Sequence, residues 1–408
     1  MTTKGQAPAR ALLAVLVLVA GGLAPRGAAA ETREEAVQAV LDAREAAIRS
    51  GDRQAFLDTV DPGADREFQA RQEALFDGLR SVPLSKYELR VRTDEVPDLA
   101  GGLAERYAAE EVFLPPVEAR YRIEGVDDVD ALDGLYYTFI RRDGRWRIAS
   151  DTDVEDLGLP SARNPWDFGP VSRARSSHFT VLFDAADRGR AEALLTLAEE
   201  ARERLADGFD RPLPDQILLI LPHTVDQLAE MLQATFDLTN FVAFAAASVD
   251  RDQGWESSSP RVFAQDVNLV RSRREFQLET LHHELVHVAA FGLAGPFVPA
   301  WVHEGLADWL AKGGGEPAEV PGSDEVLPED FEFTTGGLDA IVSSYQESTS
   351  AVAFLARSKG RDSPLDLLVE AGKPRIAPGT VDYHTDAALR SLYGKGLADF
   401  QREWAGGK

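Results

Sequence analysis

The chain carries, at positions 280–287, the segment Thr280-Leu281-His282-His283-Glu284-Leu285-Val286-His287. Within it lies the pattern His283-Glu284-x-x-His287, whose two histidines are four residues apart. Residues at this spacing share one face of a helix, one turn apart, so both imidazoles can reach one small cation. Glu284 lies one step around the helix and can contact a water on that cation, which is the position of a general base. The segment therefore predicts a metal site on a helix.

The residues around this pattern help to decide between a metal site and a plain helix surface. The pattern alone arises by chance in roughly one chain in a hundred of this length, and it would then be three polar residues on an exposed face. The neighbouring side chains, such as Leu281, Leu285 and Val286, are however apolar. A mostly buried helix with two histidines and a glutamate needs partners for them, because unpaired buried polar groups cost free energy. This favours the metal site.

A second segment follows, at positions 299–310: Pro299-Ala300-Trp301-Val302-His303-Glu304-Gly305-Leu306-Ala307-Asp308-Trp309-Leu310. It also reads as a helix, with Glu304 and Asp308 four residues apart on one face. Together the two segments resemble a gluzincin (peptidase MA-like) zinc metallopeptidase, of the superfamily that includes thermolysin and the aminopeptidase N group. Those enzymes have a paired-histidine helix and a second helix that supplies a glutamate inside a Glu-Gly-Leu-Ala motif. The resemblance covers roughly residues 175–405 and is concentrated in 280–310.

This resemblance implies a division of roles. It makes zinc ligands of His283, His287 and Glu304, and it makes Glu284 the catalytic base. In that superfamily an acidic residue four positions past the ligand glutamate often orients a zinc histidine, and Asp308 occupies this position. The histidines next to the ligands, His282 and His303, are interpreted as packed or surface residues; the alternatives are that His282 supports a ligand and that His303 lines the cleft.

A third segment offers a candidate for stabilising the oxyanion, the negatively charged oxygen that develops on the substrate carbonyl. Residues 345–355 (YQESTSAVAFL) resemble the next helix of aminopeptidase-N-like gluzincins, in which a tyrosine hydroxyl stabilises the oxyanion. Tyr345 is at the matching place; the alternative is an ordinary helix tyrosine with a packed ring. Tyr383 and His384 are weaker candidates for the same duty. No Gly-x-Met-Glu-Asn motif, which holds a free amino terminus in aminopeptidase N relatives, is found, so the choice between endo- and exopeptidase stays open.

The first half of the chain follows a different pattern. Residues 36–48 fit one helical face with Arg44 as the single polar interruption, and Asp52 can cap the next helix. Alternation with period two then predicts strands near 87–91 and 119–123, and Arg142-Asp143-Gly144 predicts a hairpin. Helices followed by long antiparallel strands indicate an α+β domain over residues 31–155. It resembles the nuclear-transport-factor-like fold, a curved sheet around helices, and is read as an accessory or binding domain, or as one that only packs on its neighbour.

The second half begins after a segment rich in proline and glycine. Residues 156–172 are predicted to be a linker, and 173–408 the metallopeptidase domain. Strands are expected at 178–183, 216–221, 242–249 and 262–270, with helices at 188–207, 225–235 and from about 275 onward. This order predicts a mixed sheet followed by a bundle of helices that carries the active site, so that the fold class of the whole chain is α+β.

Composition limits the kinds of partner and ligand. The chain has 408 residues, 68 acidic against 43 basic, a net charge of −25 and no cysteine. Such a charge argues against nucleic acid as a partner, and the lack of cysteine leaves only His, Asp and Glu to hold a metal. Residues 1–30 read as a secretory signal with the apolar stretch 11–20 and a cleavage site at 28–30; the alternative is an uncleaved anchor. We therefore expect an exported, extracytoplasmic protein with no stable membrane span after cleavage.

The sequence thus predicts an exported zinc metallopeptidase that acts on peptides or proteins. Two other hypotheses stay open. One is a binding or scaffold protein that keeps the zinc site without catalysis, and the other is a zinc hydrolase with a substrate other than a peptide. The oligomeric state and the natural substrate are left undetermined by the residues.

Overall fold

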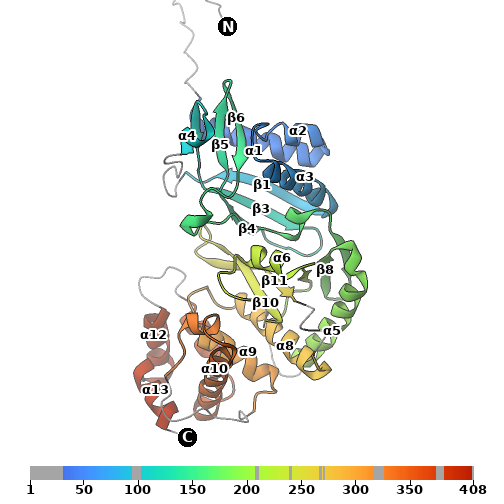
Figure 1. Ribbon diagram of the computed structural model, residues 1–408. Coiled ribbons are helices and arrows are strands. Elements are labelled where there is room, and N and C mark those ends of the chain that lie inside the picture. Colours follow the sequence, from blue (N-terminus) through green and yellow to red (C-terminus); the bar gives the residue numbers. More distant parts are fainter. Residues whose placement is uncertain are drawn as a thin grey trace, which may run out of the picture. The chain divides into compact units, whose positions relative to one another are not determined.

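The computed structural model describes residues 31–93, 103–206, 211–238, 241–265, 269, 272–315, 326–373 and 381–406. The predicted signal segment, residues 1–30, lies outside these ranges. Helices and three sheets make up the described part, which confirms the predicted α+β class (Figure 1). Residues Arg33–Lys408 form one compact unit, and the division at residues 155 and 172 stays a prediction. In the described ranges no helix has the length and apolar character needed to cross a membrane.

The N-terminal half consists of helices followed by antiparallel strands. Its strands form two sheets, of orders β1-β3-β4 and β2-β5-β6. The Asp52 side chain caps α2 by accepting the Ala55 N–H at 3.0 Å, as predicted. The predicted hairpin joins β5 to β6 through Asp143 and Gly144, which have the positive φ angles of 52° and 69° that such a tight turn needs. The elements are α1 Arg33–Ser50, α2 Arg53–Leu57, α3 Arg66–Ser81, β1 Leu84–Val91, α4 Leu103–Tyr107, β2 Glu111–Phe113, β3 Val117–Ile123, β4 Ala131–Leu135, β5 Thr138–Arg142 and β6 Arg145–Ser150.

The polar interruption in α1 is part of the core. Arg44 is fully buried, and its guanidinium lies 3.8 Å from the centre of the Phe56 ring. It donates hydrogen bonds to the Thr59 hydroxyl and to the Gln72 side chain. A buried arginine is tolerated where an aromatic face and hydrogen-bond acceptors surround it. Arg44 therefore joins α1 to α2 and α3 from inside.

The predicted linker packs against the N-terminal helices. It contains two short 3₁₀ helices, η1 (Glu155–Leu157) and η2 (Pro165–Phe168). Trp166 of η2 is buried with its ring edge-on to Tyr121 of β3, at 5.2 Å between ring centres. The contact with α3 is so close that a Cβ added at Gly78 would lie 2.0 Å from the Trp166 carbonyl oxygen. Glycine is needed here because any side chain would push η2 away.

The second half is built on a mixed five-stranded sheet of order β10-β11-β9-β8-β7. Strand β9 is parallel to β8 and to β11, whereas the two outer pairs are antiparallel. The strand predicted at 262–270 lies earlier in the chain than expected: β11 begins at Glu256 and ends at Ala264. Its first part is polar and lacks the apolar pattern on which the prediction depended. The elements are β7 Ser172–Arg175, β8 Phe179–Phe183, η3 Ala185–Asp187, α5 Arg188–Ala206, β9 Ile217–Leu221, α6 Val225–Leu232, β10 Ala243–Asp250 and β11 Glu256–Ala264.

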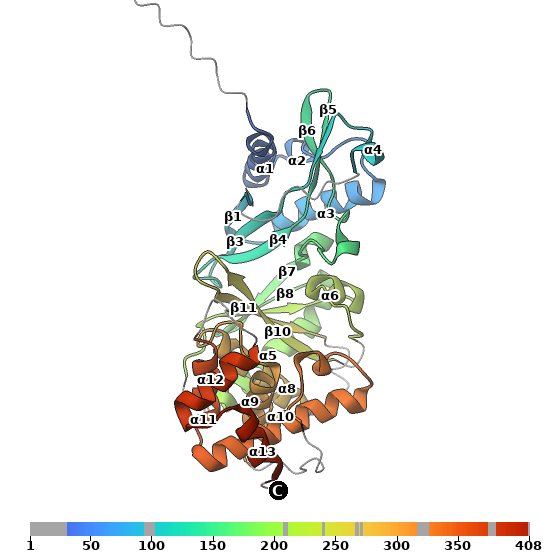
Figure 2. The same cartoon turned by 90° about the vertical axis from the view of Figure 1, so that its left-hand side faces the viewer.

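The two faces of this sheet are covered differently. Phe179 and Ile217 belong to the cluster that α5 and the later helices complete, whereas Leu182 and Ile220 belong to a cluster shared with α6 and with Trp166. Burial on both faces explains the continuous apolar runs of β8 and β9. Helices α8, α9 and α10 lie together on one side of the sheet (Figure 2). The remaining elements are α8 Arg274–Phe291, α9 Ala300–Ala311, η4 Asp330–Phe333, α10 Leu338–Lys359, α11 Ser363–Ala371, α12 Val381–Tyr393 and α13 Leu397–Gly406.

The close approach of α3 and η2 is open to a direct test. Gly78→Ala should lower the free energy of unfolding by about 1–3 kcal/mol, because the added methyl group overlaps the Trp166 backbone. Gly189→Ala is the matched control, since Gly189 also lies in a helix and an added Cβ would meet nothing within 4 Å. Urea denaturation followed by circular dichroism measures both variants. Equal midpoints for the two would contradict the packing described here.

Candidate metal centre

Helix α8 is buried because it is apolar around most of its circumference. Leu278, Leu281, Leu285 and Val286 are all buried. The helix contacts α5, the strands β10 and β11, and α9. A helix that is apolar all round belongs in a protein interior, so the two histidines and Glu284 lie in the core instead of on an exposed face.

Three side chains from α8 and α9 converge on one point. The His283 Nε2 atom lies 3.0 Å from His287 Nε2 and 3.1 Å from Glu304 Oε2, and His287 Nε2 lies 3.4 Å from the same oxygen. Donor atoms bound tetrahedrally at about 2.0–2.1 Å from a metal lie about 3.3 Å from one another. The spacing and the donor types therefore fit a small divalent cation. The structure brings the three predicted ligands together as a group that can hold a metal ion.

The electrostatics of the three groups are coupled. The hydrogen bond and negative charge of Glu304 raise the pKa of His283 to about 9 against the effect of burial. In turn the two histidines hold the pKa of the Glu304 carboxyl far below its usual value. In the absence of a cation the group therefore keeps a proton on His283. A divalent cation would take over the role of that proton and satisfy all three donors at once.

Glu284 lies beside this group without belonging to it. Its side chain is almost fully buried, and burial raises its pKa above the usual range. The nearby backbone amide of Ala245, in β10, acts in the opposite direction and lowers this pKa. A carboxylate of raised pKa accepts a proton more readily than one in water, which suits a general base. The predicted role as a base is compatible with this position and stays a prediction.

Tyr345 comes to the site from α10. Its ring centre lies 6.1 Å from that of His283 and 5.3 Å from that of Phe333, and its side chain lines the same cavity as Glu304. Burial and the surrounding carboxylates raise its pKa well above 10, so the hydroxyl keeps its proton and is a donor. Tyr383 is exposed and His384 is buried, and neither lines the cavity beside the metal group. Of these three candidates for the oxyanion, only Tyr345 contacts the group.

Asp308 lies on the far side of His283. Its Oδ1 atom is 3.8 Å from His283 Nδ1, which is ion-pair range and longer than a hydrogen bond. The Thr349 hydroxyl donates to Asp308 Oδ2 at 2.8 Å, and the Lys312 ammonium also pairs with this oxygen. Asp308 is thus held close to the ring that it was predicted to orient, and the orienting role stays a prediction.

Gly305 explains how α10 packs so closely against α9. A Cβ added at this residue would lie 2.5 Å from the Ser348 carbonyl oxygen of α10. The bare backbone lets α9 and α10 pack closely, with Thr349 and Tyr345 one helical turn apart and both at the site. The glycine of the Glu-Gly-Leu-Ala motif therefore has a packing role beside the ligand.

A cavity of about 370 Å³ opens onto the metal group. Sequence reasoning missed one of its walls: β10 contributes alternate small residues, among them Ala243, Ala245 and Ala247. His303 also lines the cavity, which was the alternative to its interpretation as a packed or surface residue, and burial lowers its pKa to about 4. The alternation of small residues in β10 was visible in the sequence, but nothing local connected it to α8. The other lining residues are Phe241, Phe244, Val249, Ser257, His283, Glu284, His287, Phe291, Gly295, Pro296, Val298, Ala300, Glu304, Asp330 and Tyr345.

A second group of potential ligands needs no cation. Asp184, Asp187 and His223 have donor atoms close together. Asp187, however, accepts a hydrogen bond from Arg190 at 2.6 Å and lies 2.9 Å from His223 Nδ1. Asp184 accepts the Ala186 N–H at the start of η3. These carboxylates are satisfied by the chain itself, and the arginine would repel a metal ion.

The ligand assignment makes a clear prediction for adjacent histidines. His283→Ala should weaken zinc binding by more than about 100-fold, because one of three donors is lost. His282→Ala is the matched control: His282 is the preceding residue on α8, is also buried, and lies outside the metal group. Its loss should leave zinc affinity within about threefold of wild type. Calorimetric titration with zinc measures both, and equal losses in the two variants would remove His283 from the ligand set.

Comparisons of this chain with protein-family models, with curated proteins and with solved structures found no match. The metal group and its cavity therefore rest on the arrangement of the residues themselves.

Proposed function

We propose that this protein is a zinc-dependent metallopeptidase, as the gluzincin-like pattern of its sequence implies. The observation that carries the proposal is the convergence of His283, His287 and Glu304 beside a buried carboxylate, Glu284, at the wall of a cavity. Each role in the proposed mechanism has a residue of a suitable type. The three proposed ligands leave one coordination position open, and a candidate base and a candidate hydroxyl donor lie next to them.

Zinc is the cation that this donor set favours. Two imidazole nitrogens and one carboxylate oxygen, without thiolate, are the ligands of a catalytic zinc site. Bound there, zinc would supply a Lewis acid that activates water and polarises the substrate carbonyl. The depressed pKa of Glu304 fits a metal ligand of any kind, because the carboxylate is already in the ionised form that binds a cation.

The residues of the chain divide the remaining work. Glu284, buried beside the Ala245 backbone amide, accepts the proton of the attacking water and delivers it to the leaving amine. The Tyr345 hydroxyl, protonated across the physiological range, donates to the carbonyl oxygen as negative charge develops on it. Asp308 keeps the His283 ring oriented from its Nδ1 side.

The cavity fits a neutral or apolar segment of a peptide. Its described lining includes phenylalanines 241, 244 and 291 and the carboxylates of Glu284, Glu304 and Asp330, but neither lysine nor arginine. A substrate carboxylate would find no cation among these lining residues, so cleavage within a chain is favoured over release of a C-terminal residue. We further propose that residues 1–30 direct export, so that the substrate is an extracytoplasmic peptide or protein.

Replacement of the base tests the mechanism. Glu284→Gln should lower kcat/KM on a cleaved peptide by at least about 1,000-fold, because the general base is lost. Zinc content measured by elemental analysis should stay at the wild-type level. Glu347→Gln is the matched control: this α10 carboxylate accepts a hydrogen bond from Ser343 and is not among the lining residues of the cavity.

The assay that finds the substrate also separates the alternatives. The zinc-loaded protein is incubated with a mixed peptide library, with and without a chelator, and products are identified by mass spectrometry. Chelator-sensitive cleavage that Glu284→Gln abolishes supports the peptidase. Tight zinc binding without cleavage of any peptide would indicate a non-catalytic binding protein or a hydrolase of another substrate class, and cleavage at the wild-type rate by Glu284→Gln would refute the mechanism.

A further inference from the structure

Strand β10 has two faces with different neighbours. Its alternate residues Ala243, Ala245, Ala247 and Val249 line the cavity together with Glu284, and the Ala245 backbone amide is near enough to lower the pKa of Glu284. The position of this strand therefore sets both the shape of the cavity wall and one contact of the predicted base. The strand is at the edge of its sheet, paired through hydrogen bonds only with β11. An edge strand has a ladder of hydrogen bonds on one side only, so its other contacts contribute to its position.

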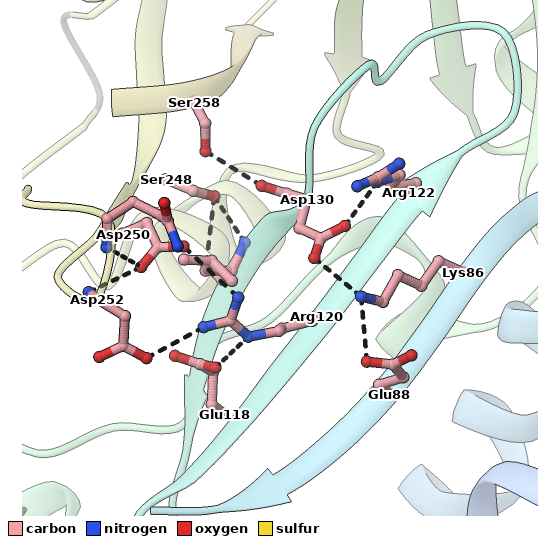
Figure 3. A network of polar contacts seen from close by, with 12 residues as sticks. Lys86, Glu88, Glu118, Arg120, Arg122, Asp130, Ser248, Asp250, Asp252 and Ser258 are labelled. Atoms are coloured by element: carbon pink, nitrogen blue, oxygen red, sulfur yellow. Dashed lines mark hydrogen bonds and ion pairs between the residues drawn. The ribbon is translucent and has the colours of Figure 1, made fainter. Parts of the chain in front are cut away.

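Three serines of the β10–β11 hairpin bond to the backbone of one segment in the N-terminal half. The Ser248 hydroxyl accepts the Leu132 N–H at 3.0 Å and donates to the Leu132 carbonyl at 3.2 Å. Ser258 and Ser259 donate to the carbonyls of Asp130 and Val129, each at 3.1 Å. Figure 3 shows Ser248 and Ser258 pointing from the hairpin toward the strand that follows Asp130. The loop and strand at 129–132 thus run beside the hairpin and satisfy its polar side chains.

The hairpin is irregular where these bonds form. The pairing of β10 with β11 shifts register between Ala246 and Ser248, and Ser259 has a positive φ of 48°. A non-glycine residue in this conformation costs free energy and persists only where its surroundings hold it. Arg261 completes the support, because its guanidinium pairs with both carboxylate oxygens of Asp127 at 2.8 and 3.0 Å. The bulge is therefore held from the N-terminal half.

Ion pairs fix the turn of the same hairpin. Arg120 of β3 lies between Glu118, at 2.5 Å, and the carboxylates of Asp250 and Asp252, at 3.5 and 3.3 Å (Figure 3). Arg92 makes the same link from the end of β1, to Glu118 at 2.8 Å and Asp252 at 3.1 Å. The arginine side chains are only 11–14% exposed, so solvent screens these pairs less than ordinary surface pairs.

We propose that the N-terminal half supports the cavity wall: residues 118–132 hold the β10–β11 hairpin in place, with Arg120 and Ser248 as positioning residues. The N-terminal α+β half thereby acts on the candidate site, although none of its described residues lines the cavity. Its structural part stands alone, and its consequence for turnover rests on the proposed peptidase function.

A double variant tests the support. Arg120→Ala with Ser248→Ala removes one of the two cations that join Glu118 to Asp252, the other being Arg92, and the hydroxyl that bonds Leu132. In the full-length, zinc-loaded protein, backbone amides of residues 243–250 should exchange with solvent at least about tenfold faster than in wild type, whereas those of α9 keep their protection. Hydrogen exchange followed by mass spectrometry measures both segments and requires no activity. If the amides of α9 also lose protection in the double variant, the exchange of residues 243–250 and of α9 is measured instead in the single variant Ser248→Ala.

The matched control and the rescue separate positioning from general stability. Arg53→Ala breaks ion pairs with Glu73 and Asp77 inside the N-terminal half, away from the hairpin, and should leave the exchange of 243–250 unchanged. Arg120→Lys with Ser248→Thr retains the charge and the hydroxyl and should restore most of the protection. On a cleaved peptide, the double alanine variant should raise KM about tenfold and change kcat less than about threefold, with zinc content unchanged.

The outcomes are distinct for the two proposals. Exchange of residues 243–250 at the wild-type rate in the double alanine variant overturns the support by the N-terminal half. Faster exchange in a protein that cleaves no peptide retains that support and refutes the peptidase instead. Faster exchange with unchanged KM would show that the wall is held but does not contact the substrate, which overturns the positioning role of Arg120 and Ser248.

Discussion

The meeting of two imidazoles and a carboxylate inside a packed helical layer is the constraint on which this structure depends. His283, His287 and Glu304 lie within 3.4 Å of one another through their donor atoms, in a region where apolar helices exclude most water. Such a cluster is stable only if a proton or a cation compensates its polarity. The close packing of α8, α9 and α10 follows from this need, since each helix contributes a group that touches the cluster or a residue that holds one.

The close contact of α9 with α10 gives the cluster its surroundings. Gly305 removes the side chain that would separate the two helices, and α10 then presents Tyr345 to Glu304 and Thr349 to Asp308. On the opposite side, β10 presents a backbone N–H to Glu284. The cluster is thus enclosed by a helix on one side and an edge strand on the other, and the cavity is what remains between them. The strand in turn depends on bonds to a part of the chain more than a hundred residues earlier.

Local patterns predicted much of this arrangement. The spacing of His283 and His287 needed only helical periodicity and knowledge of which side chains bind metals, whereas the roles of Glu304 and Asp308 came from the resemblance to gluzincins. The cap at Asp52, the hairpin at Asp143-Gly144 and the α+β class were likewise readable, because each depends on neighbours in sequence. Errors arose where tertiary pairing overrides local pattern. The strand β11 starts at Glu256, within a polar run of serines whose hydroxyls are used by the N-terminal half, so the apolar signal placed it too late.

The sequence by itself determined which side chains could hold a metal: with no cysteine, a metal must be held by histidine and carboxylate, and one short stretch supplies that set. Only the tertiary structure decided what surrounds the set. It brought Tyr345 to the ligands, buried His303 beside them, and made the alternate small residues of β10 a cavity wall. The physical reason is that the order of strands in a sheet and the approach of helices depend on contacts between distant segments. Residue periodicity reports which face of an element is buried, but it does not report which distant segment buries it.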